Sequence, residues 1–194
     1  MRKMDYTKTD EIKKYLEKTL TPKRYNHSLG VAKEAVKLAS IYGIDQEKAY
    51  YAGLVHDIAK CYSVEEMNRQ IRDFGMSLWY WNNQSLAHSK IGKHILARDF
   101  GVDDEDILNA VSYHTTGRYG MSMLEEIIYV ADAVEASRTY EGVRRLRHLA
   151  RYNIDEACLE ILDFCIESIT GRNRVLDPDT PEARKYIKEK LQRR

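Results

Sequence analysis

The sequence has little cysteine, almost no net charge and no long apolar run, and each absence excludes a class of protein. Its 194 residues include three cysteines, Cys61, Cys158 and Cys165, with no C-x-x-C spacing. This argues against a disulfide framework and a thiolate zinc site, and it favours a reducing, cytoplasmic location. The 31 Lys and Arg residues balance 30 Asp and Glu, so an extended nucleic-acid surface is not expected. No window approaches the roughly 18 uninterrupted apolar residues of a membrane span, so we expect a soluble protein.

Proline is also rare, which favours a helical chain. It occurs three times, and elsewhere apolar residues recur at intervals of three and four, as in amphipathic helices. Predicted helices span residues 9–20, 22–42, 46–60, 64–73, 86–99, 104–113, 123–137, 141–151, 154–170 and 181–192. Thr21 and Thr180 each precede a proline, and Ser63 and Ser122 each open an S-x-x-E capping box, so each is expected to begin a helix. The sequence therefore predicts an all-α bundle, as one domain over residues 1–194.

Six polar residues lie in similar settings, on predicted helices among apolar or small neighbours. They are His27 in "RYNHSLGVA", His56 and Asp57 in "GLVHDIAK", His88 in "SLAHSKIG", His114 in "AVSYHTTG" and Asp132 in "IIYVADAVE". Any one histidine alone is more often a hydrogen-bonded core residue than a ligand, because an unpaired buried polar group costs about 1–3 kcal/mol. Six together indicate a shared partner, and imidazole and carboxylate have a metal in common.

The ligand types narrow the metal and its chemistry. Imidazole and carboxylate without thiolate suit iron, manganese, zinc, nickel or cobalt. Because a catalytic metal keeps an open position, six ligands exceed what one metal needs, and two metals bridged by Asp57 fit better. A two-metal centre activates water and clamps both oxygens of a phosphoryl transfer. The sequence therefore predicts hydrolysis of a phosphoester or phosphoanhydride.

The ordered set of six residues resembles the H…HD…H…H…D pattern of HD-domain metal-dependent phosphohydrolases. Within that superfamily the chain is most similar to the bacterial YqeK family, symmetrical bis(5′-nucleosyl)-tetraphosphatases that cut diadenosine tetraphosphate into two ADP. The matching segments run from about residue 22 to residue 186 and include "YAGLVHDIAK", "AVSYHTTG" and the tail "GRNRVLDPDTPEARKY". The resemblance implies an HD-domain helical bundle with its core near residues 22–140, where C-terminal helices complete the nucleotide pocket.

Site residues follow from the resemblance position by position. It implies a metal centre of iron, as a di-iron pair or with other divalent transition metals, held by His27, His56, Asp57, His88, His114 and Asp132. It implies catalytic roles for Asp57 and Lys60. The nucleotide contacts that it implies are Arg24, Asp57, Lys60, His114, Thr115, Asp132, Arg138, Thr170, Gly171, Arg172, Asn173, Arg174 and Val175. Cations near the metals would neutralise the roughly four negative charges of a tetraphosphate.

The spacing of two cations supports this transfer. Arg24 lies three residues before His27 and Lys60 three after Asp57, so each is expected near the metal-facing side of its own helix. Arg118, beside the "HTTG" segment, is a weaker candidate.

Other histidines and aromatic residues stay outside the predicted site. His94 lies six residues after His88 and therefore faces away from it. His148 belongs to the basic stripe "RRLRHLA", which is more typical of a solvated helix face than of an RNA surface. The aromatic cluster Trp79–Trp81 can stack on an adenine, but such clusters are more often core or a dimer contact, and a homodimer therefore stays open.

Three alternatives remain for the function. The same chemistry could act on a nucleoside triphosphate or monophosphate instead of a dinucleoside polyphosphate. A non-catalytic sensor of an ADP-like nucleotide could keep the metals for structure alone. An RNA-associated module using the basic stripe is disfavoured by the balanced charge and would need steeply salt-dependent binding.

Overall fold

The computed structural model describes residues 9–193. Residues 1–8 and 194, which the predicted single domain includes, lie outside the described residues. Within residues 9–193 every regular element is helical and no strand occurs, which confirms the all-α prediction. The α-helices are α1 (Thr9–Thr19), α2 (Pro22–Tyr42), α3 (Gln46–Val55), α4 (Val64–Asp73), α5 (Gln84–Phe100), α6 (Glu105–Tyr113), α7 (Met123–Val134), α8 (Val143–Tyr152), α9 (Ile154–Thr170) and α10 (Asp179–Gln192). A short 3-10 helix, η2 (Leu78–Tyr80), precedes α5.

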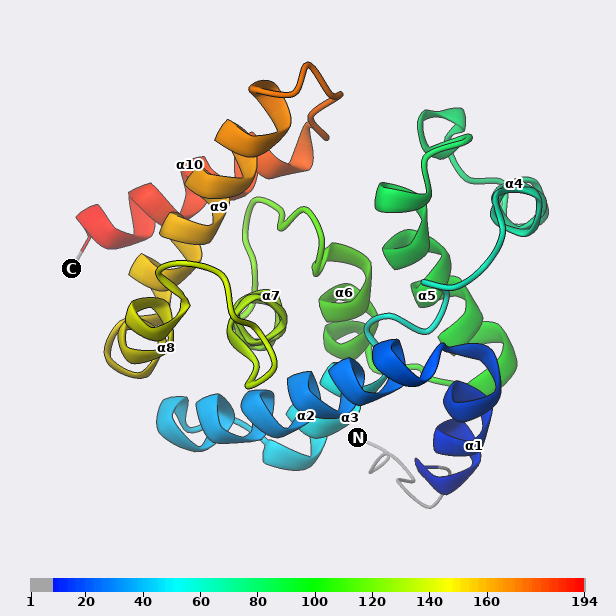
Figure 1. The fold of residues 1–194 in the computed structure, drawn as a ribbon, viewed down its shortest axis with the longest axis horizontal. Coiled ribbons are helices and arrows are strands. Elements are labelled where there is room, and N and C mark those ends of the chain that lie inside the picture. The colour runs from blue at the N-terminus through cyan, green and yellow to red at the C-terminus, as the bar shows by residue number, and fades with distance from the viewer. Residues whose placement is uncertain (1–8, 194) are drawn as a thin grey trace.

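Helix α7 occupies the centre of the bundle. It packs against α2, α3, α6, α8 and α9, and Figure 1 shows it nearly end-on among them. Almost every residue from Leu124 to Val134 is buried, as expected of a helix that is apolar on all sides. A polar side chain on this helix therefore needs a partner inside the protein.

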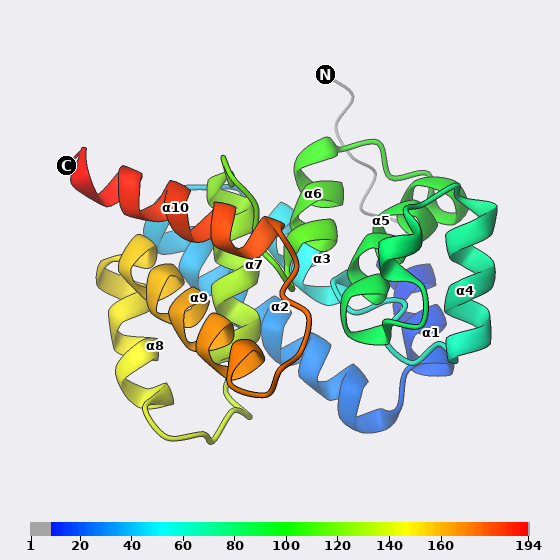
Figure 2. The same ribbon diagram turned by 90° about the horizontal axis from the view of Figure 1, so that it is seen from above.

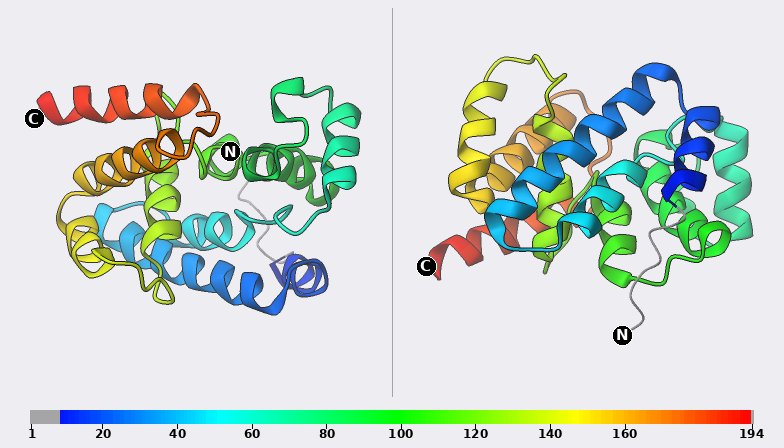
Figure 3. Two further views of the ribbon diagram at one scale, coloured as in Figure 1. Left: turned by 45° about the horizontal axis from the view of Figure 1, so that its top comes forward. Right: turned by 90° about the horizontal axis from the view of Figure 1, so that it is seen from below.

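Six of the other helices lie at two ends of the molecule, which α2 joins. Helices α1, α4 and α5 lie at one end, and α8, α9 and α10 lie at the other (Figure 2). Figure 3 shows the same division from two further sides. Helix α2 contacts both α1 and α8 and so reaches from one end to the other. Within residues 9–193, no helix combines the length and the apolar character needed to cross a membrane.

A close approach of α2 and α3 sets the position of the His-Asp pair. A Cβ atom built on Gly53 would lie 2.8 Å from the Cα of Ala32, so only glycine permits this crossing. Because α3 ends two residues later, the crossing holds His56 and Asp57 against α2.

The prediction of one helix over 46–60 is wrong, because α3 ends at Val55. The ring Nδ1 of His56 donates to the carbonyl of Gly53 at 2.7 Å, and that carbonyl is the one that the amide of Asp57 would use in a continuing helix. Beyond it the amides of Ile58 and Lys60 donate three residues back, at 3.0 and 2.8 Å. The His-Asp pair therefore lies in a tight turn and not inside a helix.

Other helix boundaries also differ from prediction by up to three residues, and side-chain contacts account for two of them. Helix α7 ends at Val134, three residues early, because the carboxylate of Glu135 accepts from the amide of Ser137 at 2.7 Å. Helix α10 begins at Asp179, so Thr180 is not its cap. The carboxylate of Asp177 accepts from the Asp179 amide instead, at 3.0 Å.

Three predicted caps are confirmed. The side chain of Thr21 accepts from the Arg24 amide at the start of α2, and Ser122 forms a complete capping box at the start of α7. Ser63 caps α4 by accepting from the Glu66 amide.

Candidate metal centre and active site

All six predicted metal ligands converge at the centre of the bundle, beside α7. His27 comes from α2, His56 and Asp57 from the end of α3, His88 from α5, His114 from the end of α6 and Asp132 from α7. Five of the six are buried, and Asp132 is partly exposed. Ligand atoms from these residues form three overlapping groups, in each of which all atoms lie within 4.8 Å of one another. Five helices, distant in sequence, thus place their polar side chains around one point.

Backbone carbonyls orient three of the imidazole rings. Nδ1 of His56, of His88 and of His114 each donates to a carbonyl on its own helix, at 2.7, 3.0 and 2.8 Å. Because a carbonyl can only accept, the proton must be on Nδ1. In the neutral ring the lone pair is therefore on Nε2, the atom that faces the centre, and this is the form in which histidine binds a metal.

A carboxylate orients the fourth ring and was missed by sequence reasoning. The buried Glu135 lies 3.1 Å from Nδ1 of His27, on the side of the ring away from the centre. Its close approach to α2 requires Gly30, because a Cβ there would lie 2.6 Å from Glu135 Oε2. The sequence signal was the spacing, since Glu135 follows Asp132 by three residues and so could reach the same region.

The two oxygens of Asp57 face different histidines. Oδ2 lies 3.4 Å from Nε2 of His56. Oδ1 lies 3.3 and 3.5 Å from Nε2 of His88 and of His114. Asp57 is therefore placed between two sets of ligands. Asp132 Oδ1 completes the ring of donors at 2.9 Å from Nε2 of His27.

The donor set fits a metal. Nε2 of His27, Nε2 of His56 and Oδ1 of Asp57 are buried and have no hydrogen-bond partner among the described residues. Leaving such atoms unpaired is unfavourable by about 1–3 kcal/mol each, and a cation would satisfy them together. Imidazole and carboxylate without thiolate suit divalent transition metals.

Burial and neighbouring side chains favour the ligating forms of His88, His114 and Asp57. Burial lowers the pKa of His88 to about 4 and also lowers the pKa of His114. Burial alone would raise the pKa of Asp57, but the surrounding imidazoles, His56 first, hold it well below its usual range. At neutral pH, Asp57 is therefore a carboxylate and His88 and His114 are neutral imidazoles, the forms that bind a metal without prior loss of protons.

Three predicted cations and a hydroxyl surround the centre. Nη1 of Arg24 lies 2.8 Å from Asp57 Oδ2, Nζ of Lys60 lies 3.1 Å from His88 Nε2, and Nη2 of Arg138 lies 2.6 Å from Asp132 Oδ1. The hydroxyl of Thr115 is 3.3 Å from His88 Nε2. These groups border a cavity of about 310 Å³ to which α9 adds Ile161 and Cys165. Anion-binding groups thus lie directly beside the ligand atoms.

The structure places Lys60 beside the centre, but helical spacing does not bring it there. Lys60 lies in the turn after α3 and not on a helix. Its Nζ is nevertheless 4.0 Å from Asp57 Oδ1. The tight turn, and not helical spacing, brings the two side chains together.

Some predicted residues lie elsewhere. Residues 170–175 are exposed at the end of α9 and in the turn after it, and no hydrogen bond or ion pair within the described residues joins them to the centre. The guanidinium of Arg118 donates two hydrogen bonds, of 2.7 and 2.6 Å, to the carboxylate of Glu125. Arg118 is therefore not part of the centre. His94 stacks on Phe74 at 4.7 Å, away from the six ligands as predicted.

Both tryptophans of the Trp79–Trp81 cluster contact other parts of the fold. Nε1 of Trp79 donates to the carboxylate of Asp177, ahead of α10, at 3.2 Å. The ring of Trp81 packs under the guanidinium of Arg72, at 5.5 Å. Neither tryptophan lines the cavity at the centre. The role of the cluster in nucleotide stacking or dimerisation stays a prediction.

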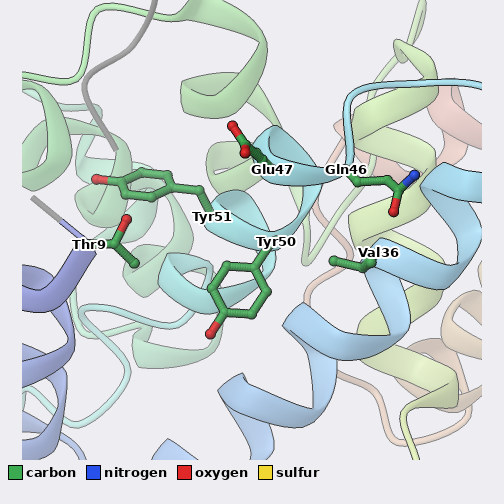
Figure 4. Close-up of a pocket in the computed structure, with 6 residues that line it drawn as sticks. All are labelled: Thr9, Val36, Gln46, Glu47, Tyr50 and Tyr51. Carbon is green, nitrogen blue, oxygen red and sulfur yellow. The ribbon is translucent and has the colours of Figure 1, made fainter. Parts of the chain in front are cut away.

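A separate pocket between α1, α2 and α3 has none of these features. It measures about 340 Å³ and includes Glu47, Tyr50 and Tyr51 (Figure 4). No histidine lines it. This pocket is therefore separate from the metal centre.

Comparison with known proteins agrees with this site. The HD-domain family matches residues 24–137, which include the six ligand candidates, so the fold and the site define an HD-domain protein. Symmetrical bis(5′-nucleosyl)-tetraphosphatase of Bacillus subtilis is 38% identical over 166 residues, which cover 85% of this chain and 89% of that protein. The protein of the same name from Staphylococcus aureus is 36% identical, and the match covers 87% of this chain and 91% of that protein. The chain belongs to the symmetrical bis(5′-nucleosyl)-tetraphosphatase family of HD-domain proteins.

A solved structure shows the same fold over nearly the whole chain. It is a predicted HD superfamily hydrolase involved in NAD metabolism from Clostridium acetobutylicum. The two chains are 41% identical, and their superposition has a TM-score of 0.89 over 96% of this chain and 98% of the other. The helices α8 to α10 are therefore part of the shared fold and not an addition to it.

Proposed function

We propose that this protein hydrolyses diadenosine tetraphosphate symmetrically, giving two molecules of ADP. The single observation that carries the proposal is the convergence of six imidazole and carboxylate ligands, bordered by Arg24, Lys60 and Arg138. The names of the relatives, which match over most of their length, support the substrate. A polyanion needs cations beside the reacting phosphorus, and the centre has three.

The proposed cofactor is iron, as a pair of ions held by the six residues. The two oxygens of Asp57, which face His56 on one side and His88 and His114 on the other, support a bridging role. Divalent metals bound there would make water a stronger nucleophile at neutral pH and polarise the phosphoryl oxygens. Other divalent transition metals suit the same donors.

The protein's own side chains would position the substrate. Asp57 would orient the attacking water, since it lies between the two ligand sets. Lys60, Arg24 and Arg138 would hold the polyphosphate and stabilise the charge that develops on the leaving ADP. The α9 side chains that line the cavity support the proposal that C-terminal helices complete the nucleotide pocket around an HD core of residues 22–140. Contacts from residues 170–175 to the nucleotide remain part of the proposal.

Product analysis tests the substrate and the position of cleavage. Protein purified without chelator is assayed for metal content and for turnover of diadenosine tetraphosphate. ADP as the sole product is expected, because two equivalent halves and one tight diphosphate site select the middle cut. Formation of AMP and ATP, or no turnover, would overturn the proposal. Parallel assays with ATP and AMP separate this substrate from other nucleotides.

The variant Asp57→Ala separates an enzyme from a nucleotide sensor. It removes a carboxylate shared by two of the ligand groups, so we expect loss of bound metal. ADP formation should fall by more than about 100-fold, which exceeds the effect of losing a residue that only orients a ligand. The matched control Glu47→Gln changes a carboxylate in the separate pocket of Figure 4 and is expected to keep both properties. A wild-type protein that binds nucleotide but forms no ADP is a sensor.

A further inference from the structure

A second cavity opens directly from the catalytic one. It measures about 520 Å³ and lies between α8, α9 and the turn after α7. The two cavities share four lining residues, Ala133, Arg138, Ile161 and Cys165. Arg138 therefore forms part of both walls. A molecule whose phosphates lie at the metal centre can extend into this space, which we call the α8–α9 pocket.

Two exposed aromatic rings line the α8–α9 pocket. Phe164 is 66% exposed and Tyr140 is 42% exposed, although large apolar side chains elsewhere in the described chain are mostly buried. The hydroxyl of Tyr140 donates to the carbonyl of Ala133 at 2.8 Å, which fixes the ring beside the shared wall. Leu146 and Ile161 add apolar surface. A flat aromatic ligand is the group that such rings bind by stacking.

The charges of the α8–α9 pocket disfavour phosphate. Its lining includes four carboxylates, from Glu141, Glu160, Asp163 and Glu167, against the guanidiniums of Arg138 and Arg145. Arg145 is paired with Glu160, at 2.9 Å for one of its two hydrogen bonds. Asp163 is paired with Arg184, which lies outside the pocket lining.

Carboxylates that remain can accept hydrogen bonds from a neutral ligand. Glu141 and Glu167 form no ion pair within residues 9–193. The amino group of a base and the hydroxyls of a ribose are donors, whereas a phosphate would be repelled. The occupant that combines a flat ring, hydrogen-bond donors and no negative charge of its own is a nucleoside.

We infer that the α8–α9 pocket binds a nucleoside of the dinucleotide substrate, with the base stacked on Phe164 and Tyr140 and with Arg138 at the junction to the phosphates. The inference rests on the proposed function, which supplies a ligand with both a polyphosphate and a nucleoside. Neither Phe164 nor Tyr140 is among the site residues implied by the family resemblance. The two rings would determine that the enzyme prefers nucleotides to bare polyphosphates.

Binding of ADP and of pyrophosphate by the metal-loaded protein tests the inference. Pyrophosphate has the anionic part of ADP but no nucleoside. By calorimetry, Phe164→Ala is expected to weaken ADP binding by about 5- to 150-fold, the range for loss of one base–aromatic stack, and to leave pyrophosphate binding unchanged. Tyr140→Ala is expected to act in the same direction. Phe164→Tyr, which keeps an aromatic ring, should retain ADP binding, whereas Phe164→Leu should not.

The control variant is Tyr152→Ala, which removes a ring that is 74% exposed and lies outside the pocket. It should change neither affinity. Equal weakening of ADP and pyrophosphate by Phe164→Ala, no weakening of either, or wild-type protein that binds both ligands equally well would each overturn the inference. Turnover of diadenosine tetraphosphate is measured in parallel. Protein that shows the expected ADP effect without turnover contradicts the proposed function but not the nucleoside pocket.

Discussion

Two buried clusters of carboxylates receive a side chain from α7, and they differ in what balances their charge. In the first, Glu126 and Asp155 each lie 2.7 Å from Nζ of Lys190, which joins α7 and α9 to α10. In the second, Asp132 and Asp57 face imidazole nitrogens, and each is also paired with an arginine, Arg138 and Arg24. The first cluster has a cation of the chain between its acids. The second has ligand atoms that face one another, which is the arrangement that a cation from solution would complete.

The two sets of acids therefore differ in their pKa shifts, although burial acts in the same direction on both. Burial raises the pKa of Glu126 to about 8, helped by Asp155 and opposed by Lys190. The pKa of Asp57 is well below its usual range, although burial also acts to raise it, because imidazoles surround it. Burial by itself does not decide ionisation, since the neighbours do. The first cluster thus stabilises the fold, and the second is prepared to bind.

The largest expected effect comes from removing the cation of the first cluster. Lys190→Met removes the cation that lies 2.7 Å from both Glu126 and Asp155, and loss of one partner of a buried ion pair lowers the free energy of unfolding by about 3–5 kcal/mol. Chemical denaturation measures this change. Lys188→Met, an exposed neighbour on α10, is the control and should stay within about 0.5 kcal/mol of wild type. A similar small change for Lys190→Met would mean that the cluster does not hold α10.

The pH dependence of stability sharpens the same contrast. The folded pKa of Glu126 is about 8, above its unfolded value of about 4.3, so between these values the folded state holds a proton that the unfolded state has lost. The stability contribution of Glu126 is therefore greatest below about pH 4.3 and falls, by several kcal/mol at most, as the pH rises to about 8. Glu126→Gln cannot ionise and should flatten this part of the profile. Thermal unfolding of both proteins at pH 5 to 8 gives the slopes, and parallel slopes would refute the assignment.

The smallest expected effect concerns the outer side of the second cluster. Glu135→Gln keeps an oxygen for His27 but loses the negative charge that favours its Nδ1 proton, so metal affinity should fall by about 10- to 100-fold. A competition titration with a chelator measures this affinity. Glu105→Gln, an exposed carboxylate paired with Lys93, serves as the control. Unchanged affinity in Glu135→Gln would show that the carbonyl-held rings alone determine metal binding.

Most of the fold and the membership of the site could be predicted from the sequence. Helical periodicity and caps such as Thr21 are local, so they are visible before folding. The six ligands could be found because their residue types and order form a pattern. Glu135 was missed, because its spacing from Asp132 is only a weak signal and its contact with His27 joins positions 108 residues apart. The α8–α9 pocket was missed for the same reason, since its exposed rings become meaningful only beside the catalytic cavity.

The helix ends were the least predictable feature. The sequence from Gln46 to Lys60 keeps a helical pattern and contains no proline, so nothing local predicts that α3 ends at Val55. The ring of His56 donates a hydrogen bond to the Gly53 carbonyl instead. The ring of His114 likewise donates to the carbonyl of Val111 at the end of α6. A side chain in its tertiary setting thus overrides the propensity of the backbone.

Because His56 and His114 lie at helix ends, a metal at the centre would join two segments in which regular helix stops. A cation that binds the folded cluster and not the unfolded chain adds to stability by mass action, by about 4 kcal/mol when its concentration is 1,000 times its dissociation constant. That contribution is comparable to a large part of the stability of an ordinary domain. The supply of metal to the cell would then determine how long this protein survives proteolysis, as well as how fast it hydrolyses its substrate.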